Sequence, residues 1–142
     1  METTTTPTVI TVQNTINAPV AKVWEYYTTP AHIITWNTPH ESWHTTRAEN
    51  DLRVGGSFVS RMEAKDGSFG FDFGGIYDEV RTHELIAYTM GDGRKVSATF
   101  TSEGNATTVV VKFDAETQNS EEIQRGGWQA ILDNFKKHTE TN

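Results

Sequence analysis

Alternating apolar and polar positions characterise the first regular segment of the chain. Within residues 9–16, Ile10, Val12 and Ile16 share one parity, and a period of two predicts a β-strand. Strand-like segments then recur at regular spacing, at residues 57–64, 69–81, 84–90, 95–103 and 106–115. Short stretches rich in Gly, Asp and Asn separate them, and such stretches join antiparallel neighbours. The pattern therefore predicts an antiparallel sheet of about six to seven strands.

Helical periodicity follows the first strand. Residues 20–27 place apolar side chains at positions i, i+3, i+4 and i+7, which predicts a short amphipathic helix. Asn17 is its expected N-cap, with Pro19 in the first turn. Pro30 ends or restarts this helix, and residues 32–36 are expected to form a second short one. Residues 38–50 are polar without a clear period.

The C-terminal segment predicts one long helix over residues 119–137. Asn119 or Ser120 can cap it, and two acidic residues suit the positive end of the helix dipole. A sheet with one face to bury and a single long helix to cover it is expected to curl around that helix. The predicted fold class is therefore α+β, with a curved antiparallel sheet wrapped around the C-terminal helix. The apolar stripe of the helix consists of Ile123, Gly127, Trp128, Ile131, Leu132 and Phe135.

Two glycine pairs carry specific expectations. Gly74-Gly75 interrupts a strand in which residues 69, 71 and 73 share one parity and residues 76 and 80 the other, so a bulge at the pair would turn both sets to one side. Gly126-Gly127 lies inside the long helix, where each glycine costs about 1 kcal/mol relative to alanine. Either the sheet approaches closely there, or space is left open beside Trp128.

Composition narrows the class of protein. A length of 142 residues favours one domain, expected over residues 9–142, after a threonine-rich segment 1–8 expected to be a disordered tail. The chain has no cysteine, which excludes disulfides and thiolate metal sites. A net charge of −7 with scattered basic residues argues against nucleic acid as a partner. No apolar run reaches the roughly 20 residues of a membrane span, so we expect a cytoplasmic protein without membrane insertion.

Three segments resemble a known superfamily in order and spacing. Residues 16–24 (INAPVAKVW), 51–58 (DLRVGGSF) and 127–132 (GWQAIL) are similar to the START-like superfamily, in particular to the branch named after the activator of the Hsp90 ATPase. The resemblance implies a helix-grip fold with a cavity between sheet and helix. Members bind lipids, polyketides or proteins, and some are cyclases. Asn37 departs from the pattern, because many relatives carry a second tryptophan at this position of the expected pocket floor.

Aromatic and apolar side chains are the candidate ligand contacts, although most of them would also suit a filled core. A polar set could orient a ligand, namely His44, Glu49, Arg61, Glu63 and Asp72. Parity places Arg61, Glu63 and Asp72 on the outer face, because Phe58 and Met62 are the expected inward pair. The predicted ligand-binding residues are Trp36, Trp43, His44, Phe58, Phe71, Phe73, Tyr77, Tyr88, Phe100, Trp128 and Ile131.

Residues 40–44 spell H-E-x-x-H, which in zinc proteases lies on a helix together with a third ligand. Here Pro39 precedes the motif and no helical period runs through it. The segment also corresponds to a loop in START-like relatives. We therefore predict no metal and no other cofactor.

Three functions remain after these exclusions. The first is a non-enzymatic binding protein, monomeric or homodimeric, for a small apolar or amphipathic molecule. The second is a protein-interaction module such as a co-chaperone, with a chaperone as partner. The third is a cyclase- or hydratase-like enzyme that uses His44 or a carboxylate as acid or base, which requires that group to lie inside the pocket.

Overall fold

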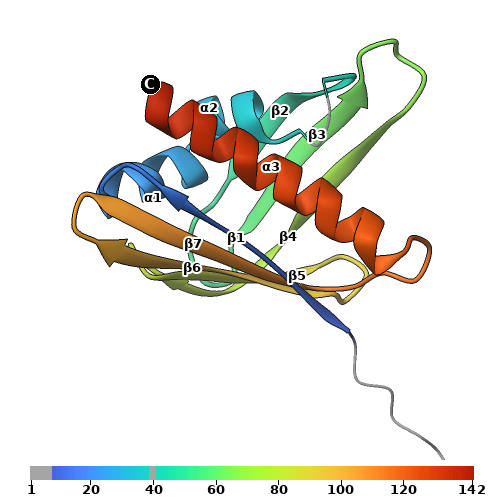
Figure 1. Cartoon of the computed structure of the whole chain (residues 1–142). Helices are drawn as coiled ribbons and strands as arrows, with labels where there is room; N and C mark the ends of the chain where they lie inside the picture. Colours follow the sequence, from blue (N-terminus) through green and yellow to red (C-terminus); the bar gives the residue numbers. More distant parts are fainter. Residues whose placement is uncertain (1–7, 39–40) are drawn as a thin grey trace, which may run out of the picture.

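The computed structural model describes residues 8–38 and 41–142. Seven antiparallel strands form one sheet in the order β1-β7-β6-β5-β4-β3-β2, so every neighbouring pair except β1 and β7 is also adjacent in sequence. The sheet curls around the long helix α3, and α1 and α2 cover one end of the same face (Figure 1). The predicted α+β helix-grip architecture is confirmed. The strands and helices are β1 Val9–Ile16, α1 Val20–Thr28, α2 Pro30–Trp36, β2 Trp43–Asn50, β3 Ser57–Ala64, β4 Gly70–Arg81, β5 Leu85–Met90, β6 Lys95–Glu103, β7 Ala106–Asp114 and α3 Glu121–Thr141.

The strand β2 was not expected from the polar, aperiodic segment 38–50. It lies at the edge of the sheet and pairs with β3 alone. Thr45 is its only buried residue, so the strand carries almost none of the apolar alternation that sequence reasoning depends on. Most of the tail expected over residues 1–8 lies outside the described residues. The exception is Thr8, whose carbonyl accepts a hydrogen bond from the backbone N–H of Ala115.

The bulge in β4 is displaced from the predicted glycine pair. The register with β5 shifts between Tyr77 and Glu79, three residues further along the chain. Phe73 and Tyr77 therefore face the helix, Val80 returns to that face after the bulge, and Ile76 is 55% exposed on the opposite face. The expectation that residue 76 points inward was wrong.

Gly74 and Gly75 allow close packing of strands instead. A Cβ at Gly74 would collide with the carbonyl oxygen of Phe58 on β3. A Cβ at Gly75 would lie 2.7 Å from the carbonyl oxygen of Thr89 on β5, closer than real Cβ contacts. The pair thus lets β4 pass tightly between its two neighbours, in agreement with the close-approach role of glycine in strands.

Helix ends follow the sequence signals with small shifts. The Ser120 hydroxyl accepts a hydrogen bond from the Ile123 N–H at 3.1 Å and caps α3, as one of the two predicted alternatives. The helix extends four residues beyond the predicted end, to Thr141. The N-cap of α1 is Pro19 and not Asn17, whose backbone N–H donates instead to the carboxylate of Glu140.

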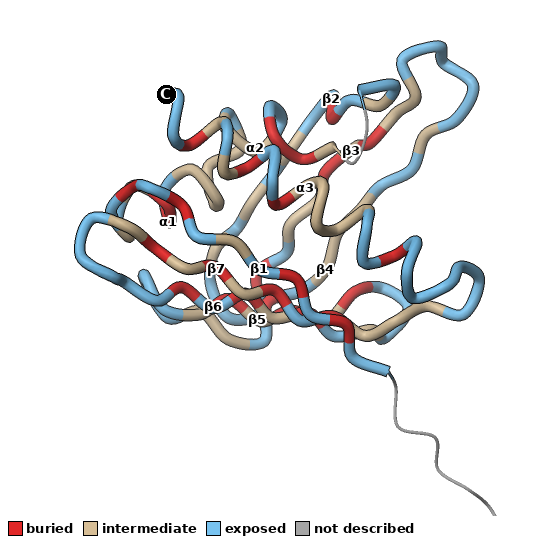
Figure 2. Tube along the Cα trace, in the orientation of Figure 1, coloured by how far each residue is buried: buried red, intermediate tan, exposed pale blue. Residues whose placement is uncertain are grey.

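The helix α3 has two unlike halves. Its C-terminal half is packed, with Leu132, Phe135 and Thr139 buried among β1, α1 and α2 (Figure 2). Its N-terminal half keeps Ile123, Trp128 and other stripe residues exposed or only partly buried. This difference shows that the sheet is filled under one half of α3 and hollow under the other. None of the described helices is both long and apolar enough to cross a membrane.

Candidate functional site

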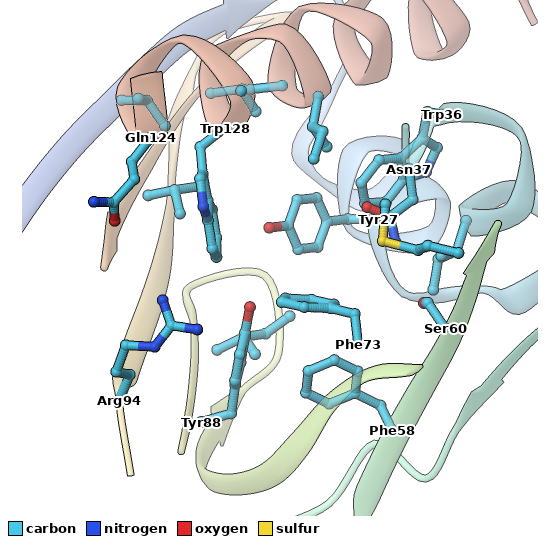
Figure 3. Close-up of a pocket in the computed structure, with 18 of the residues that line it drawn as sticks. Tyr27, Trp36, Asn37, Phe58, Ser60, Phe73, Tyr88, Arg94, Gln124 and Trp128 are labelled. Atoms are coloured by element: carbon cyan, nitrogen blue, oxygen red, sulfur yellow. The ribbon is translucent and has the colours of Figure 1, made fainter. Parts of the chain in front are cut away.

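A cavity of about 450 Å³ lies between the curved sheet and the N-terminal half of α3 (Figure 3). This volume is within the usual range of small-molecule sites, about 300–1,000 Å³. Strands β3, β4 and β5 form one wall, α3 forms the opposite wall, and α1 and α2 close one end. Aromatic residues in the lining are Tyr27, Trp36, Phe58, Phe71, Phe73, Tyr77, Tyr88 and Trp128.

Ring contacts fix the two long walls. On α3, the indole of Trp128 stacks on Phe113 of β7, with 4.1 Å between centroids and 12° between planes. Trp128 also meets Phe73 of β4 edge-on at 6.0 Å. On the sheet, Phe58 contacts Tyr88 edge-on at 4.6 Å. These ring contacts hold Trp128, Phe58 and Tyr88 in place, and the two walls meet where Trp128 touches Phe73.

Trp36 forms the closed end of the cavity. Its indole Nε1–H donates to the carbonyl of Tyr26 at 2.9 Å, and its ring stacks on Tyr27 and meets Phe135 edge-on. Asn37, at the position where a second tryptophan was expected by resemblance, is buried and also lines the cavity. The Thr45 hydroxyl donates to the Asn37 carbonyl at 2.7 Å and so anchors this end to β2. Asn37 therefore puts a short amide at the floor.

The glycine pair of α3 leaves space open. Cβ atoms built at Gly126 and Gly127 would meet no heavy atom within 4 Å, so no close approach of the sheet explains either residue. Gly127 lines the cavity, and Gly126 does not. Of the two alternatives drawn from the sequence, the open space beside Trp128 is the correct one.

Several polar groups reach the cavity from different elements. The hydroxyls of Tyr27 on α1 and Tyr88 on β5 point into it, and Ser60 on β3 lines it as well (Figure 3). Burial raises the pKa of Tyr27 to about 12 and that of Tyr88 well above its usual value of 10. At neutral pH both groups are protonated and can donate a hydrogen bond.

Tyr77 differs from the other two tyrosines of the lining because its hydroxyl has a protein partner. It donates to the side-chain oxygen of Asn50 at 2.5 Å. Burial is the main reason that the pKa of Tyr77 lies above its usual value. Its hydroxyl is committed to holding β4 against the end of β2, so Tyr77 contributes mainly its ring to the cavity.

Gln124 organises the loop that precedes α3. Its side-chain oxygen accepts from the Glu116 N–H at 2.9 Å, and its amide nitrogen donates to the carbonyls of Glu116 and Asn119. Gln124 is 8% exposed and lines the cavity, but these three bonds use its polar capacity. Its role is to shape the rim beside Glu116.

Eight of the eleven predicted ligand-binding residues line the cavity, namely Trp36, Phe58, Phe71, Phe73, Tyr77, Tyr88, Trp128 and Ile131. Phe100 lies outside it, buried edge-on against Trp24 and Tyr27. Trp43 packs beside Phe69 and Phe71 near the tip of the β3–β4 hairpin. His44 is exposed on β2. The last two differ because residues 43–50 form an edge strand rather than the expected loop.

The polar set from the sequence remains outside. Arg61 forms ion pairs with Glu63 at 3.1 Å and with Asp72 at 3.5 Å on the outer face of the sheet, as parity predicted. Ser60 and Met62, which share the parity of Phe58, are buried and line the cavity. Sequence reasoning missed Tyr27, Asn37, Ser60 and Arg94 as site residues. The alternation of residues along β3 could have identified Ser60, which lies on the same face as Phe58 and Met62. Arg94 follows a turn, and no sequence pattern there indicated that its side chain reaches the cavity.

The H-E-x-x-H segment is only partly described. Pro39 and His40 lie outside the described residues, and Glu41 lies in a turn before β2. His44 belongs to a strand, so the motif does not continue on a helix. Among residues 8–38 and 41–142, no three His, Asp or Glu side chains are grouped as metal ligands would be.

Comparison with known proteins assigns the chain to a family. The family described as activator of Hsp90 ATPase homolog 1-like protein matches residues 17–140. The chain belongs to this family. Its fold is similar to the solution structure of an AHSA1-like protein from Aeromonas hydrophila, with 42% identity, a TM-score of 0.88, and 94% and 93% of the two chains covered. A search of curated proteins finds no significant match.

Two further structures extend the comparison. The solution structure of Chr148 from Cytophaga hutchinsonii shares 53% identity with a TM-score of 0.81, covering 94% of this chain and 92% of that one. The crystal structure of CV1439 from Chromobacterium violaceum has 23% identity and a TM-score of 0.86, covering 96% and 100%, and shows likeness of fold alone. The family match over residues 17–140 and the AHSA1-like structure from Aeromonas hydrophila confirm the START-like branch that the sequence resembles.

Proposed function

We propose that this AHSA1-like protein is a non-catalytic binding protein for a small apolar or amphipathic molecule. The observation that carries the proposal is the cavity of about 450 Å³ between the sheet and α3, lined mainly by aromatic and aliphatic side chains. Burial of about 300–400 Å² of apolar surface contributes about 8–10 kcal/mol. After an association cost of about 4 kcal/mol, the lower end of the usual range, about 4–6 kcal/mol remains, which corresponds to a dissociation constant between about 1 mM and about 40 μM.

The arrangement of acid–base groups supports binding rather than catalysis. An enzyme of the cyclase or hydratase class needs an acid or base within hydrogen-bond reach of the reacting atoms. His44, the candidate for that role, is exposed on β2 and does not line the cavity. Glu116 lines the rim, but one of its carboxylate oxygens accepts from the Asn119 N–H at 2.6 Å. The cysteine-free composition suits the cytoplasmic location that we include in this proposal.

The matched glycines of α3 provide the test. N-phenyl-1-naphthylamine, an apolar probe that fluoresces when it leaves water, is titrated into the parent protein and into Gly127→Leu and Gly126→Leu. Position 127 lines the cavity, so a leucine side chain there occupies part of the ligand space. Position 126 does not line the cavity, so Gly126→Leu is the matched control. We expect binding to the parent and to Gly126→Leu, and a large loss in Gly127→Leu. Equal binding by all three would place the probe elsewhere and contradict the proposal.

Co-purified ligand would give an independent result. Native mass spectrometry of freshly purified protein is expected to show an added mass of lipid size that disappears after denaturation and refolding. The refolded protein should then bind more of the naphthylamine probe than the fresh protein does. A fresh sample without added mass that also fails to bind the probe would oppose a ligand-binding role.

A second candidate function is interaction with the chaperone Hsp90, which the family name suggests. The observation in its favour is an exposed aromatic group at the β3–β4 hairpin, where Phe69 and Phe71 are 61% and 39% exposed beside Trp43. Exposed apolar groups of this kind often mark contact sites. Stimulation of Hsp90 ATP hydrolysis that is lost in Phe69→Ser, with probe binding unchanged, would favour this function over the first.

A further inference from the structure

One end of the cavity carries a cationic side chain with a fixed orientation. Arg94 follows the turn between β5 and β6, and its side chain is 28% exposed. Its Nε–H donates to Asp92 at 2.7 Å, and its backbone N–H donates to the other oxygen of the same carboxylate at 3.1 Å. These bonds hold the guanidinium at the cavity, and they also lower the pKa of Asp92. A preorganised arginine loses less side-chain entropy when it binds a further group.

The outer nitrogens of Arg94 remain available to a ligand. Among the described residues, Asp92 is the only side chain bonded to this guanidinium, and the bond is to Nε. Figure 3 shows both terminal nitrogens directed toward the space bounded by Tyr88 and Trp128. Two parallel N–H groups of arginine match the two oxygens of a carboxylate.

The hydroxyl of Tyr88 adds a second donor to the same space. Tyr88 is 8% exposed, and its ring is held edge-on by Phe58 at 4.6 Å. Its hydroxyl points into the cavity on the side of Arg94, and no other described residue bonds to it (Figure 3). A hydroxyl that opens onto the cavity without a protein partner is free to donate a hydrogen bond to a ligand. The tyrosine is protonated at neutral pH and therefore offers a hydrogen.

The carboxylates at this rim are engaged by the protein. Asp92 holds Arg94, and Glu116 holds the loop through Asn119. Gln124 at the same rim is bonded to the loop, and Phe73 and Trp128, in contact at 6.0 Å, provide apolar surface beside it. A guanidinium at the edge of such a surface interacts with an anion more strongly than it would in open water.

We propose that the cavity selects an amphipathic carboxylic acid, whose carboxylate contacts Arg94 and Tyr88 while its apolar body lies between Trp128 and the sheet. This proposal rests on the ligand-binding function proposed above and assigns its specificity. Arg94 is the specificity-determining residue, Tyr88 is the second donor, and Asp92 is a positioning residue. A cationic amphiphile of the same length is rejected by Arg94.

Two pairs of probes test the proposal. N-phenyl-1-naphthylamine and 1-anilinonaphthalene-8-sulfonate share one apolar body and differ by one anionic group. Dodecanoate, dodecanol and dodecylamine share one chain and differ in head group. We expect the sulfonate to bind more tightly than the neutral probe, and dodecanoate to displace the neutral probe better than the alcohol or the amine.

Variants connect this preference to Arg94. In Arg94→Gln the preference for the anionic probes over the neutral probe should fall about ten- to a hundredfold, the usual loss of a charge-assisted hydrogen bond. Tyr88→Phe should cause a smaller loss. The control is Arg81→Gln, which removes the same charge from an exposed ion pair with Glu79 on β4. Asp92→Asn keeps the positive charge of Arg94 but weakens the bonds that orient its guanidinium, so anion binding should also weaken.

The outcomes separate the two proposals. Binding of the neutral probe and of dodecanol without any preference for anions, or with a preference that Arg94→Gln and Arg81→Gln reduce equally, overturns the assignment of Arg94 and leaves the ligand-binding function intact. Failure of every probe to bind, charged or neutral, overturns both. Thermal unfolding of each variant shows whether the fold is retained, and Tyr88→Phe gives a second reading if Arg94→Gln does not fold.

Discussion

Trp128 of α3 lies parallel to Phe113 of β7, and Phe113 is itself completely buried beneath it. A rigid sheet residue thus supports the ring that forms one wall of the cavity. Offset stacked aromatic pairs contribute about 0.5–1.5 kcal/mol beyond their buried area. The wall residue is therefore held in place from behind, and its free face is the one available to a ligand.

Replacement of Trp128 should affect stability and binding together. Trp128→Ala removes the stack and enlarges an existing void, so we expect a loss of about 3 kcal/mol, the lower end for buried aromatic truncations. Trp128→Phe keeps a ring over Phe113 and should lose less than half as much. Urea unfolding measures both values. Equal losses would show that the stack on Phe113 contributes little.

The helix glycines should respond to alanine in the same direction. Cβ atoms at positions 126 and 127 meet nothing within 4 Å, and an interior helical glycine costs about 1 kcal/mol relative to alanine. Gly126→Ala and Gly127→Ala are each expected to raise the free energy of unfolding by about 0.5–1 kcal/mol. Denaturant titration provides the measurement, and destabilisation by either substitution would show that the backbone at that position does not tolerate a side chain.

The end of α3 should make stability sensitive to mild acid. His138 Nε2 lies 3.0 Å from His32 Nδ1, whose ring stacks on Tyr26. Burial, and then the charges of His32 and Lys22, lower the pKa of His138 below 6.5. The unfolded chain therefore takes up a proton at a higher pH than the folded chain does, so stability falls as the pH drops from about 7 through 6.5 toward the lowered value.

A variant separates this effect from other acid-sensitive groups. His138→Gln should flatten the dependence of unfolding free energy on pH between about 7 and 5. The window excludes Glu140, whose pKa is already lowered from 4.5 by its bond to Lys136. A parent protein equally stable at pH 5 and pH 7 would rule out the histidine effect.

The raised pKa of Tyr27 should make the free energy of unfolding depend on pH in the alkaline range. Its pKa is raised from 10 to about 12 in the folded protein, so between these values the unfolded chain loses a proton that the folded chain retains. Stability is therefore expected to decline as the pH rises above 10. The unfolding free energy of Tyr27→Phe should fall less steeply with pH than that of the parent protein. The difference in slope corresponds to about one proton when unfolding is measured from pH 9 to 11. An unchanged slope would mean that the hydroxyl is open to water.

The fold could be predicted from the sequence because each hairpin turn and the α3 stripe carry strong local signals. The bulge at Tyr77–Glu79 could not, since it follows from pairing with β5 and has no glycine at its centre. The aromatic walls were found because aromatic residues at inward parity have few other places to lie. Arg94 was missed because a charged residue beside a turn normally faces solvent, and only the curvature of the sheet brings it to the cavity.

The two halves of α3 differ in how easily they should open locally. In the C-terminal half, Lys136 bonds to the Thr15 carbonyl of β1 and the buried Phe135 packs on Tyr27 and Trp36, whereas the N-terminal half lies over the cavity. Local opening of a helix costs least where the fewest apolar contacts are broken. Amide hydrogens near residues 123–128 should therefore exchange with solvent sooner than those near 132–139. A ligand that fills the cavity would slow that exchange. Local opening of the first turns of α3 would then be the route by which a ligand enters and leaves.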